Sequence, residues 1–190
     1  MALVVSILAV VISLGALLVS VYSLYLTRFK KGTVRMTRPR FIYFGPDSVG
    51  REDKKVMLRT LLHSTSDQGN YVQSMYIRLQ RGKSVQNFNL WFCNNGGGLE
   101  IGSGLFVDKK GIVCNHHFAM PKDGADYEFL AGEYLLQVYV ELIGEGPHKV
   151  FEQKLSLTKT QEEEMKKIGI HFNWAPNTQN YASYVDAKEK

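Results

Sequence analysis

The chain changes its hydrophobic pattern once, near residue 27. From Ala2 to Leu26 every side chain is uncharged and most are apolar. From Val34 onward, short apolar runs alternate with polar residues and with Gly, Asn, Asp and Pro. A continuous uncharged run of this length predicts a helix that can cross the ~30 Å hydrocarbon core of a bilayer. The second pattern predicts a domain of β-strands.

The first segment is typical of an uncleaved membrane anchor. A secretory signal peptide has a positively charged start, a shorter apolar stretch and a small-residue cleavage site, and none of these precedes Thr27. Tyr22 and Tyr25 lie near the end of the run, where amphipathic rings favour the headgroup layer. We therefore expect a transmembrane helix over residues 1–27.

A basic juxtamembrane segment, residues 28–40, follows the anchor and contains no acidic residue. Because Lys and Arg close to a span stay in the cytoplasm, we expect a single-pass protein with its N-terminus outside and its C-terminal domain cytoplasmic. Lys and Arg also attract anionic lipids, at about 1 kcal/mol each. The expected membrane-surface contacts are Arg28, Lys30, Lys31, Arg35, Arg38 and Arg40. Alternatively, these residues act only as a topology signal.

The positive charge of the chain is confined to this segment. The net charge is +5, but from Phe41 onward 17 basic residues stand against 18 acidic ones. We therefore expect the bilayer and its anionic lipids as partners, and no nucleic acid. Cys93 and Cys114 fit a cytosolic domain as reduced thiols.

Small residues in the anchor follow alternating steps of three and four. Such a repeat lines one stripe of a helix, and small side chains let two helices approach closely in lipid. The stripe predicts a homo- or hetero-oligomer through transmembrane helix association. An accidental pattern is the alternative, because Ala and Ser are common in spans. The residues of this stripe, called the seam below, are Ser6, Ala9, Ser13, Ala16, Ser20 and Ser23.

Short apolar runs separated by turn residues predict an antiparallel all-β domain over residues 41–175. In the run 84–93, alternation puts Phe88 on one face and Cys93 on the other. The segments expected as strands are 34–44, 55–65, 71–80, 84–93, 104–108, 112–120, 127–130, 133–143 and 149–157.

The C-terminal part predicts one short helix and one more strand. Thr160 and Glu163 have the spacing of a capping box, and Gly169 stands where the helix would end. The apolar side of the strand GIHFNW is expected to pack on the chain's own sheet, with a partner's sheet edge as the alternative. Residues 176–190 are expected to form a flexible polar tail.

The stretch YEFLAGEYLLQVYVEL resembles the strand, G-x-Y turn and strand near the end of immunoglobulin-like and fibronectin-III-like sandwiches. Gly132 and Tyr134 are similar to a tyrosine corner, in which the hydroxyl bonds to backbone upstream. The resemblance implies an antiparallel immunoglobulin-like β-sandwich. Cys93 and Cys114 do not stand at the positions of the inter-sheet disulfide of that fold, so we expect no such bond.

Candidate chemistry is concentrated in the run Cys114-Asn115-His116-His117. On a strand the two histidines point to opposite faces, so within this run at most Cys114 and His116 could share a metal ion. Further ligands would have to come from elsewhere in the chain, from Cys93, His63, His148 or His171. The paired ligand spacings of known zinc sites are missing, so we expect no metal and no cofactor. Gly82-Lys83-Ser84 lacks the earlier glycine of a phosphate-binding loop and is interpreted as a hairpin turn. We find no nucleophile paired with a base and an acid, so no enzyme is expected.

Two functional hypotheses remain. The first is a membrane-anchored interaction module, an adaptor or a small subunit of a complex, with a membrane or cytosolic protein partner. The second is a membrane-tethered sensor or a metal-binding or catalytic domain that uses Cys114, His116 and His117.

Overall fold

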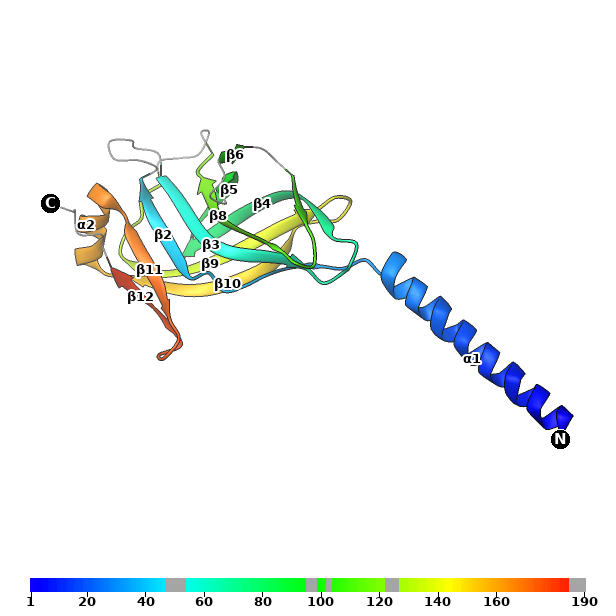
Figure 1. The fold of residues 1–190 in the computed structure, drawn as a ribbon. Helices are drawn as coiled ribbons and strands as arrows, with labels where there is room; N and C mark the ends of the chain where they lie inside the picture. Colours follow the sequence, from blue (N-terminus) through cyan, green and yellow to red (C-terminus); the bar gives the residue numbers. More distant parts are fainter. Residues whose placement is uncertain (47–53, 95–98, 102–103, 122–126, 185–190) are drawn as a thin grey trace.

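The structure is a computed structural model that describes residues 1–46, 54–94, 99–101, 104–121 and 127–184. Figure 1 shows a long helix that projects from one end of a β-rich domain. In chain order the elements are α1 (Ala2–Arg28), β1 (Val34–Met36), β2 (Phe41–Pro46), β3 (Lys54–Ser64), β4 (Asn70–Arg81), β5 (Ser84–Asn94), β6 (Leu99–Ile101), β7 (Leu105–Val107), β8 (Ile112–Ala119), β9 (Gly132–Leu142), β10 (His148–Leu157), α2 (Lys159–Ile168), β11 (Ile170–Ala175) and β12 (Asn180–Tyr184).

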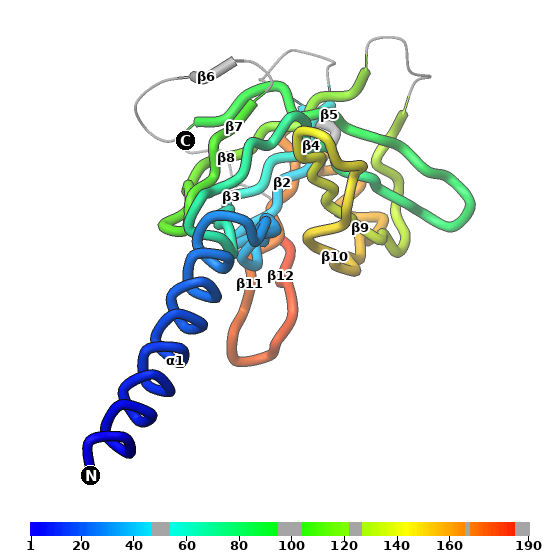
Figure 2. The backbone as a smooth tube through the Cα atoms, turned by 90° about the vertical axis from the view of Figure 1, so that its right-hand side faces the viewer, coloured from blue at the N-terminus to red at the C-terminus, as the bar shows by residue number. Residues whose placement is uncertain are grey.

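The strands join into one antiparallel sheet that forms a nearly closed barrel. The order of neighbouring strands is β10-β9-β4-β5-β8-β3-β2-β11-β12. Strand β1 pairs with β3 and also lies beside β10, so it brings two distant parts of the sheet together. Figure 2 shows the strands curling around a common interior. The prediction of a mostly antiparallel β domain behind one apolar helix is confirmed.

The core follows the alternation expected of strands with one buried face. Along β9, Tyr134, Leu136, Val138 and Val140 are all at most 1% exposed. The Tyr134 hydroxyl donates a hydrogen bond to the Leu130 carbonyl oxygen at 2.5 Å, which is the contact that the tyrosine-corner resemblance implies.

Two of the expected strands differ in the structure. The segment 34–44 is divided into β1 and β2 around Pro39, which lacks the N–H that a continuous ladder needs. Residues 127–130 form no strand. Tyr127 and Phe129 are nevertheless buried, and their rings lie 5.8 and 5.9 Å from that of Phe88. Aromatic packing, rather than strand pairing, therefore explains this apolar run.

The C-terminal helix begins two residues earlier than its predicted capping box. Thr158 is the N-cap and forms a reciprocal capping box with Gln161. Both candidate pairs satisfy the S/T-x-x-E/Q pattern, but β10 ends at Leu157, so Thr158 is the first residue free to turn away. The helix ends before Gly169, as predicted, and this glycine has a φ of 81°.

The strand after the helix packs on the chain's own sheet, as expected. Strand β11 pairs with β2, and Ile170 and Phe172 are buried. The expected flexible tail is wrong for Asn180–Tyr184, which form β12 against β11. Its Tyr181 hydroxyl donates to the Pro39 carbonyl oxygen at 2.7 Å, so one buried tyrosine holds a largely polar edge strand. Residues 185–190 lie outside the described part.

Candidate functional site

A β-bulge in β5 decides where the first cysteine points. The pairing of β5 with β8 shifts register between Leu90 and Phe92. An extra residue reverses the alternation beyond it, so Phe88 and Cys93 both face the interior although five positions separate them. The predicted placement of Cys93 on the face opposite Phe88 is therefore wrong.

The two cysteines form a disulfide, which corrects the expectation of two reduced thiols. Cys93 on β5 and Cys114 on β8 are bonded, with Cα atoms 5.9 Å apart. Neighbouring strands supply this spacing, which lies in the ordinary range for a disulfide. The bond closes a loop between positions 21 apart in sequence, and a loop of that size stabilises a fold by about 3 kcal/mol.

His116 lies directly against this disulfide. It is the Cα partner of Cys93 across β5 and β8, and it shares the inner face of β8 with Cys114. Its Nδ1 is 3.4 Å from the Cys114 Sγ and 3.8 Å from the Cys93 Sγ. Burial lowers the pKa of His116 to about 4, with a smaller contribution from His117, so the imidazole is neutral at pH 7.

His117 has the opposite environment. It points to the outer face of β8, where its ring stacks on Phe92 with centroids 4.1 Å apart. The prediction that the two histidines point to opposite faces of the strand is confirmed. Among the described residues, the ligand-bearing side chains that gather within 4.8 Å are Cys93, Cys114 and His116. The sequence singled out Cys114 and His116 as low-ranked metal candidates and gave Cys93 only as one of four possible further ligands, because a bulge leaves no clear mark in the pattern of apolar residues.

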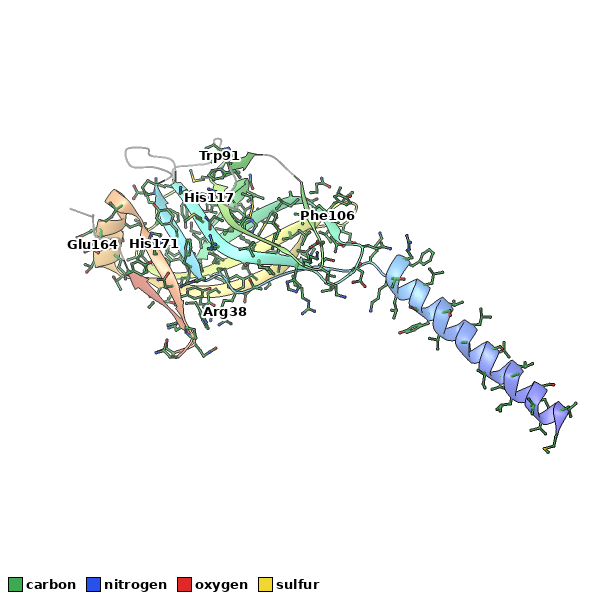
Figure 3. All side chains as sticks on the ribbon, in the orientation of Figure 1. Arg38, Trp91, Phe106, His117, Glu164 and His171 are labelled. Atoms are coloured by element: carbon green, nitrogen blue, oxygen red, sulfur yellow. A yellow bond between two sulfur atoms is a disulfide. The ribbon has the colours of Figure 1, made fainter. Side chains whose placement is uncertain are left out.

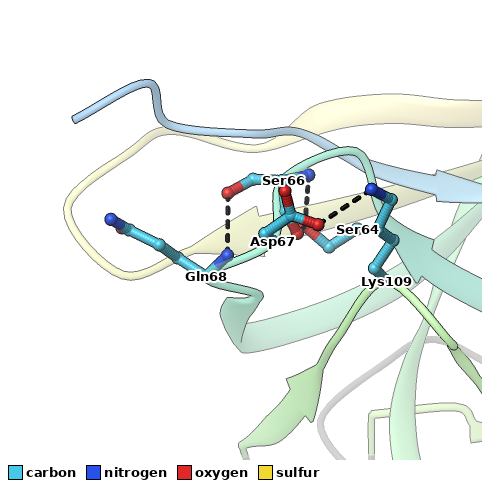
Figure 4. A network of polar contacts seen from close by, with 5 residues as sticks. All are labelled: Ser64, Ser66, Asp67, Gln68 and Lys109. Atoms are coloured by element: carbon cyan, nitrogen blue, oxygen red, sulfur yellow. Dashed lines mark hydrogen bonds and ion pairs between the residues drawn. The ribbon is translucent and has the colours of Figure 1, made fainter. Parts of the chain in front are cut away.

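A second candidate region is the end of the domain where α1 leaves it. Gln68, in the turn between β3 and β4, donates from its side-chain amide to the carbonyl oxygens of Thr27, at 3.2 Å, and Arg28. These carbonyls belong to the last turn of α1, which has no partner for them within the helix. The turn itself is held by hydrogen bonds of Ser66 with Ser64 and Gln68, and Asp67 pairs with Lys109 at 2.8 Å (Figure 4).

The linker between α1 and β1 is also attached to this turn. Thr33 and Thr65 exchange backbone and hydroxyl hydrogen bonds at 2.9 Å. A Cβ on Gly32 would lie 2.5 Å from the Ser66 nitrogen, so the close approach of the chains needs a glycine here. The end of α1 and the domain are thus joined by several short contacts.

Three exposed apolar side chains gather at the same end of the domain. Tyr71 pairs with Phe106, and their ring centroids are 4.9 Å apart. The Ile143 N–H donates to the Tyr71 carbonyl oxygen at 3.2 Å, so Ile143 lies on the other side of Tyr71. The three side chains are 62%, 50% and 66% exposed, respectively. We call Tyr71, Phe106 and Ile143 the apolar end; Figure 3 shows Phe106 near the start of the linker to α1.

The basic segment is divided between two parts of the molecule. Arg28 is the last residue of α1, and Lys30 and Lys31 follow it. Arg35 is in β1, whereas the Arg38 guanidinium lies 3.8 Å from the centroid of the Trp174 ring. The Arg40 carbonyl oxygen accepts a hydrogen bond from the backbone N–H of Trp174 at 3.0 Å. The structure therefore places Arg38 and Arg40 against β11 rather than beside the end of α1, and membrane contact of the segment stays a prediction.

Helix α1 carries the seam on a fully exposed surface. One helix in the described residues is long and apolar enough to cross a membrane, with a mean hydropathy of 2.9; a signal sequence would meet the same criteria. Ser6, Ser13 and Ser20 donate to the carbonyl oxygens four residues earlier, at 2.8–3.0 Å. Because these donors are used within the helix, close packing rather than hydroxyl donation is what the seam offers a second helix.

A small cavity lies between β4, β5 and β7. Its volume is about 140 Å³, below the roughly 300 Å³ at which ligand pockets begin. Ser74, in its lining, donates to a Glu141 carboxylate oxygen at 2.6 Å. The expectation that the chain is no enzyme stays a prediction.

Comparison with known proteins adds no family to these observations. No protein-family profile matches the chain, and no curated protein matches it.

Proposed function

We propose that the protein is a single-pass membrane-anchored interaction module that holds its β domain against the bilayer surface. The observation that carries this proposal is the coincidence of three features at one end of the domain. The last turn of α1, the turn at Gln68 that binds it and the apolar end all lie there. A domain attached in this way turns its apolar end towards the membrane that α1 enters.

The chemistry of the apolar end suits the headgroup layer. Tyrosine and phenylalanine rings favour the boundary between headgroups and acyl chains. Tyr25 and Phe29, at the end of α1, carry rings at the depth where the span meets that boundary. Lys30 and Lys31 add attraction to anionic lipids, and this attraction weakens as salt concentration rises. The module thus contacts the membrane once through helix α1 and a second time through the apolar end of the domain.

In the finer description, we propose an immunoglobulin-like sandwich on the cytoplasmic side of the membrane. The bond of the Tyr134 hydroxyl to Leu130 supports the sandwich, and the basic residues after α1 support the orientation. The Cys93–Cys114 disulfide is an argument against a reducing compartment, because such bonds are rare in the cytosol. The basic residues and the two cysteines are both consistent with a cytoplasmic domain if Cys93 and Cys114 are reduced in the cell.

The module would act as an adaptor or as a small subunit of a membrane-associated complex. The seam supports association with a second copy or another membrane helix, because Ser6, Ser13 and Ser20 keep one stripe of α1 narrow. Anchoring raises the local concentration of the domain, so a weak contact with a protein partner is sufficient for assembly.

Fluorescence quenching by brominated lipids tests the membrane contact. In full-length protein reconstituted in vesicles, a Phe106→Trp variant adds an emitter at the apolar end. A Val85→Trp variant is the matched control, since Val85 is exposed but pairs with Gln80, about 30 Å along β4 from Tyr71. Emission from Trp91 and Trp174 is subtracted with the wild-type protein.

We expect brominated lipid to remove most of the emission added by Phe106→Trp and little of that added by Val85→Trp. The physical reason is that bromine quenches only on contact, so quenching reports rings that enter the acyl region. Equal quenching of the two variants would contradict the proposal. A vesicle without bromine controls for a change of environment alone.

A further inference from the structure

We propose that Cys93, Cys114 and His116 form a zinc site when their disulfide is reduced. The proposal concerns the interior of the domain and does not depend on the membrane contact proposed above. Its basis is that three zinc-binding side chains, all buried, come together from two neighbouring strands. The disulfide of this structure is then one of two states of the same site.

The distances from the histidine to the two sulfurs already suit a tetrahedral ion. Zinc binds sulfur at about 2.3 Å and imidazole nitrogen at about 2.0 Å, so sulfur and nitrogen ligands of one ion stand roughly 3.5 Å apart. The His116 Nδ1 lies 3.4 Å from one sulfur and 3.8 Å from the other. For all three ligands to meet one ion, the two sulfurs must separate to about 3.8 Å. The His116 ring must also turn one nitrogen towards the ion, because its Nε2 lies as close to the Cys114 Sγ as its Nδ1 does, at 3.4 Å.

The position of the histidine also favours metal binding. His116 is completely buried, and its Nδ1 lies within 3.8 Å of both sulfurs. Three protein ligands leave a fourth position for water, as in open zinc sites.

The change of state balances with a small cytosolic thiol as reductant. Two molecules of a glutathione-type thiol break the Cys93–Cys114 bond and form one disulfide between themselves. Two electrons and two protons pass to the cysteine sulfurs. Binding of Zn²⁺ then releases these two protons, because zinc is bound by the thiolates.

Cobalt titration of the full-length protein in detergent tests the site. Co²⁺ takes the same tetrahedral ligands as zinc, and bonds to thiolates give it intense absorption bands that water or carboxylate ligands do not. After reduction and removal of the reductant, we expect one equivalent of Co²⁺ with thiolate bands, displaced by Zn²⁺. The oxidised protein is expected to bind none.

Two histidine variants provide the matched comparison. His116→Asn removes the proposed ligand, whereas His117→Asn changes the neighbouring ring on the other face of β8. We expect His116→Asn to weaken metal binding at least about tenfold, since even residues behind a ligand have effects of that size. His117→Asn is expected to bind as the wild-type protein does.

A Cys93→Ser variant is expected to lose the thiolate bands while its circular dichroism still shows the β domain. If that variant does not fold, the comparison of oxidised and reduced wild-type protein decides instead. The proposal is overturned if the reduced wild-type protein binds no metal, whether it remains folded or unfolds. Equal losses of Co²⁺ affinity in His116→Asn and His117→Asn would also overturn the proposal.

Discussion

Helix α1 and strand β9 are both rich in apolar residues, but the structure covers them in opposite ways. In β9 every second side chain from Tyr134 to Leu142 is at most 3% exposed. In α1 no residue is buried along 27 positions. The strand therefore obtains its apolar cover from its own chain, whereas the helix needs cover from outside, which a bilayer would supply.

The difference separates the stability of the domain from that of the anchor. Alternate residues of β9 fill the interior, so changes there should affect folding directly. Changes in α1 should alter membrane insertion or helix association without affecting the β domain. Trp91 and Trp174 both lie in the domain, so their fluorescence reports its unfolding alone.

The largest effect is expected from a cavity in β9. Leu136 is completely buried, so Leu136→Ala should lower the free energy of unfolding by about 2–5 kcal/mol. The measurement is urea unfolding of the full-length protein in detergent, followed by tryptophan fluorescence. Leu14→Ala in α1 is the control, and a similar loss in that variant would show that the helix contributes to the domain core.

Acid should lower the stability of the β domain but leave helix α1 unchanged. The pKa of His116 is about 4 in the folded domain and about 6.5 in an unfolded chain, so between these values only the unfolded chain takes up the proton. The stabilisation is complete above pH 6.5 and falls by about 3 kcal/mol as the pH drops to 4.

Urea unfolding of the oxidised protein at a series of pH values measures this slope. His116→Asn should reduce the slope strongly, whereas His117→Asn should reduce it much less, because His117 is the smaller cause of the lowered pKa of His116. The circular dichroism of α1 should persist through the acid range, because the span contains no group that titrates there. A slope that is unchanged in His116→Asn would assign the acid sensitivity to other groups.

The smallest effect is expected at the tyrosine corner. Tyr134→Phe removes the hydroxyl that bonds to Leu130 and should cost about 1 kcal/mol of unfolding free energy. The ring of Tyr139 stacks on that of Tyr76 on the outer face of the same strand, so Tyr139→Phe is a matched control. Equal changes in the two variants would mean that the corner adds nothing specific.

Much of the fold could be predicted because each face of a strand has one environment. Alternation in the segment 133–143 led directly to the buried side of β9, and the G-x-Y sequence led to the Tyr134 bond. The apolar residues at 170 and 172 likewise identified β11. These features depend on residues close together in sequence, where period and turn chemistry are informative.

The candidate sites depend on features that the pattern does not carry. The disulfide follows from the bulge at Leu90–Phe92, which reverses the parity of β5 and turns Cys93 inward. The apolar end combines residues from three strand ends, and their exposure depends on how distant turns meet. Strand β12 is a polar edge strand that pairs with β11 and buries Tyr181, and its composition is that of a loop.

The short linker also limits what the domain can meet. Residues 29–33 separate α1 from β1, and five extended residues span at most about 17 Å. With Thr33 attached to Thr65, even this length is not free. In a bilayer the domain would diffuse laterally at a fixed distance from the membrane surface, so it would meet its partners in two dimensions only. Its partners would then be selected by how far their own binding surfaces stand from the membrane, before any contact is made.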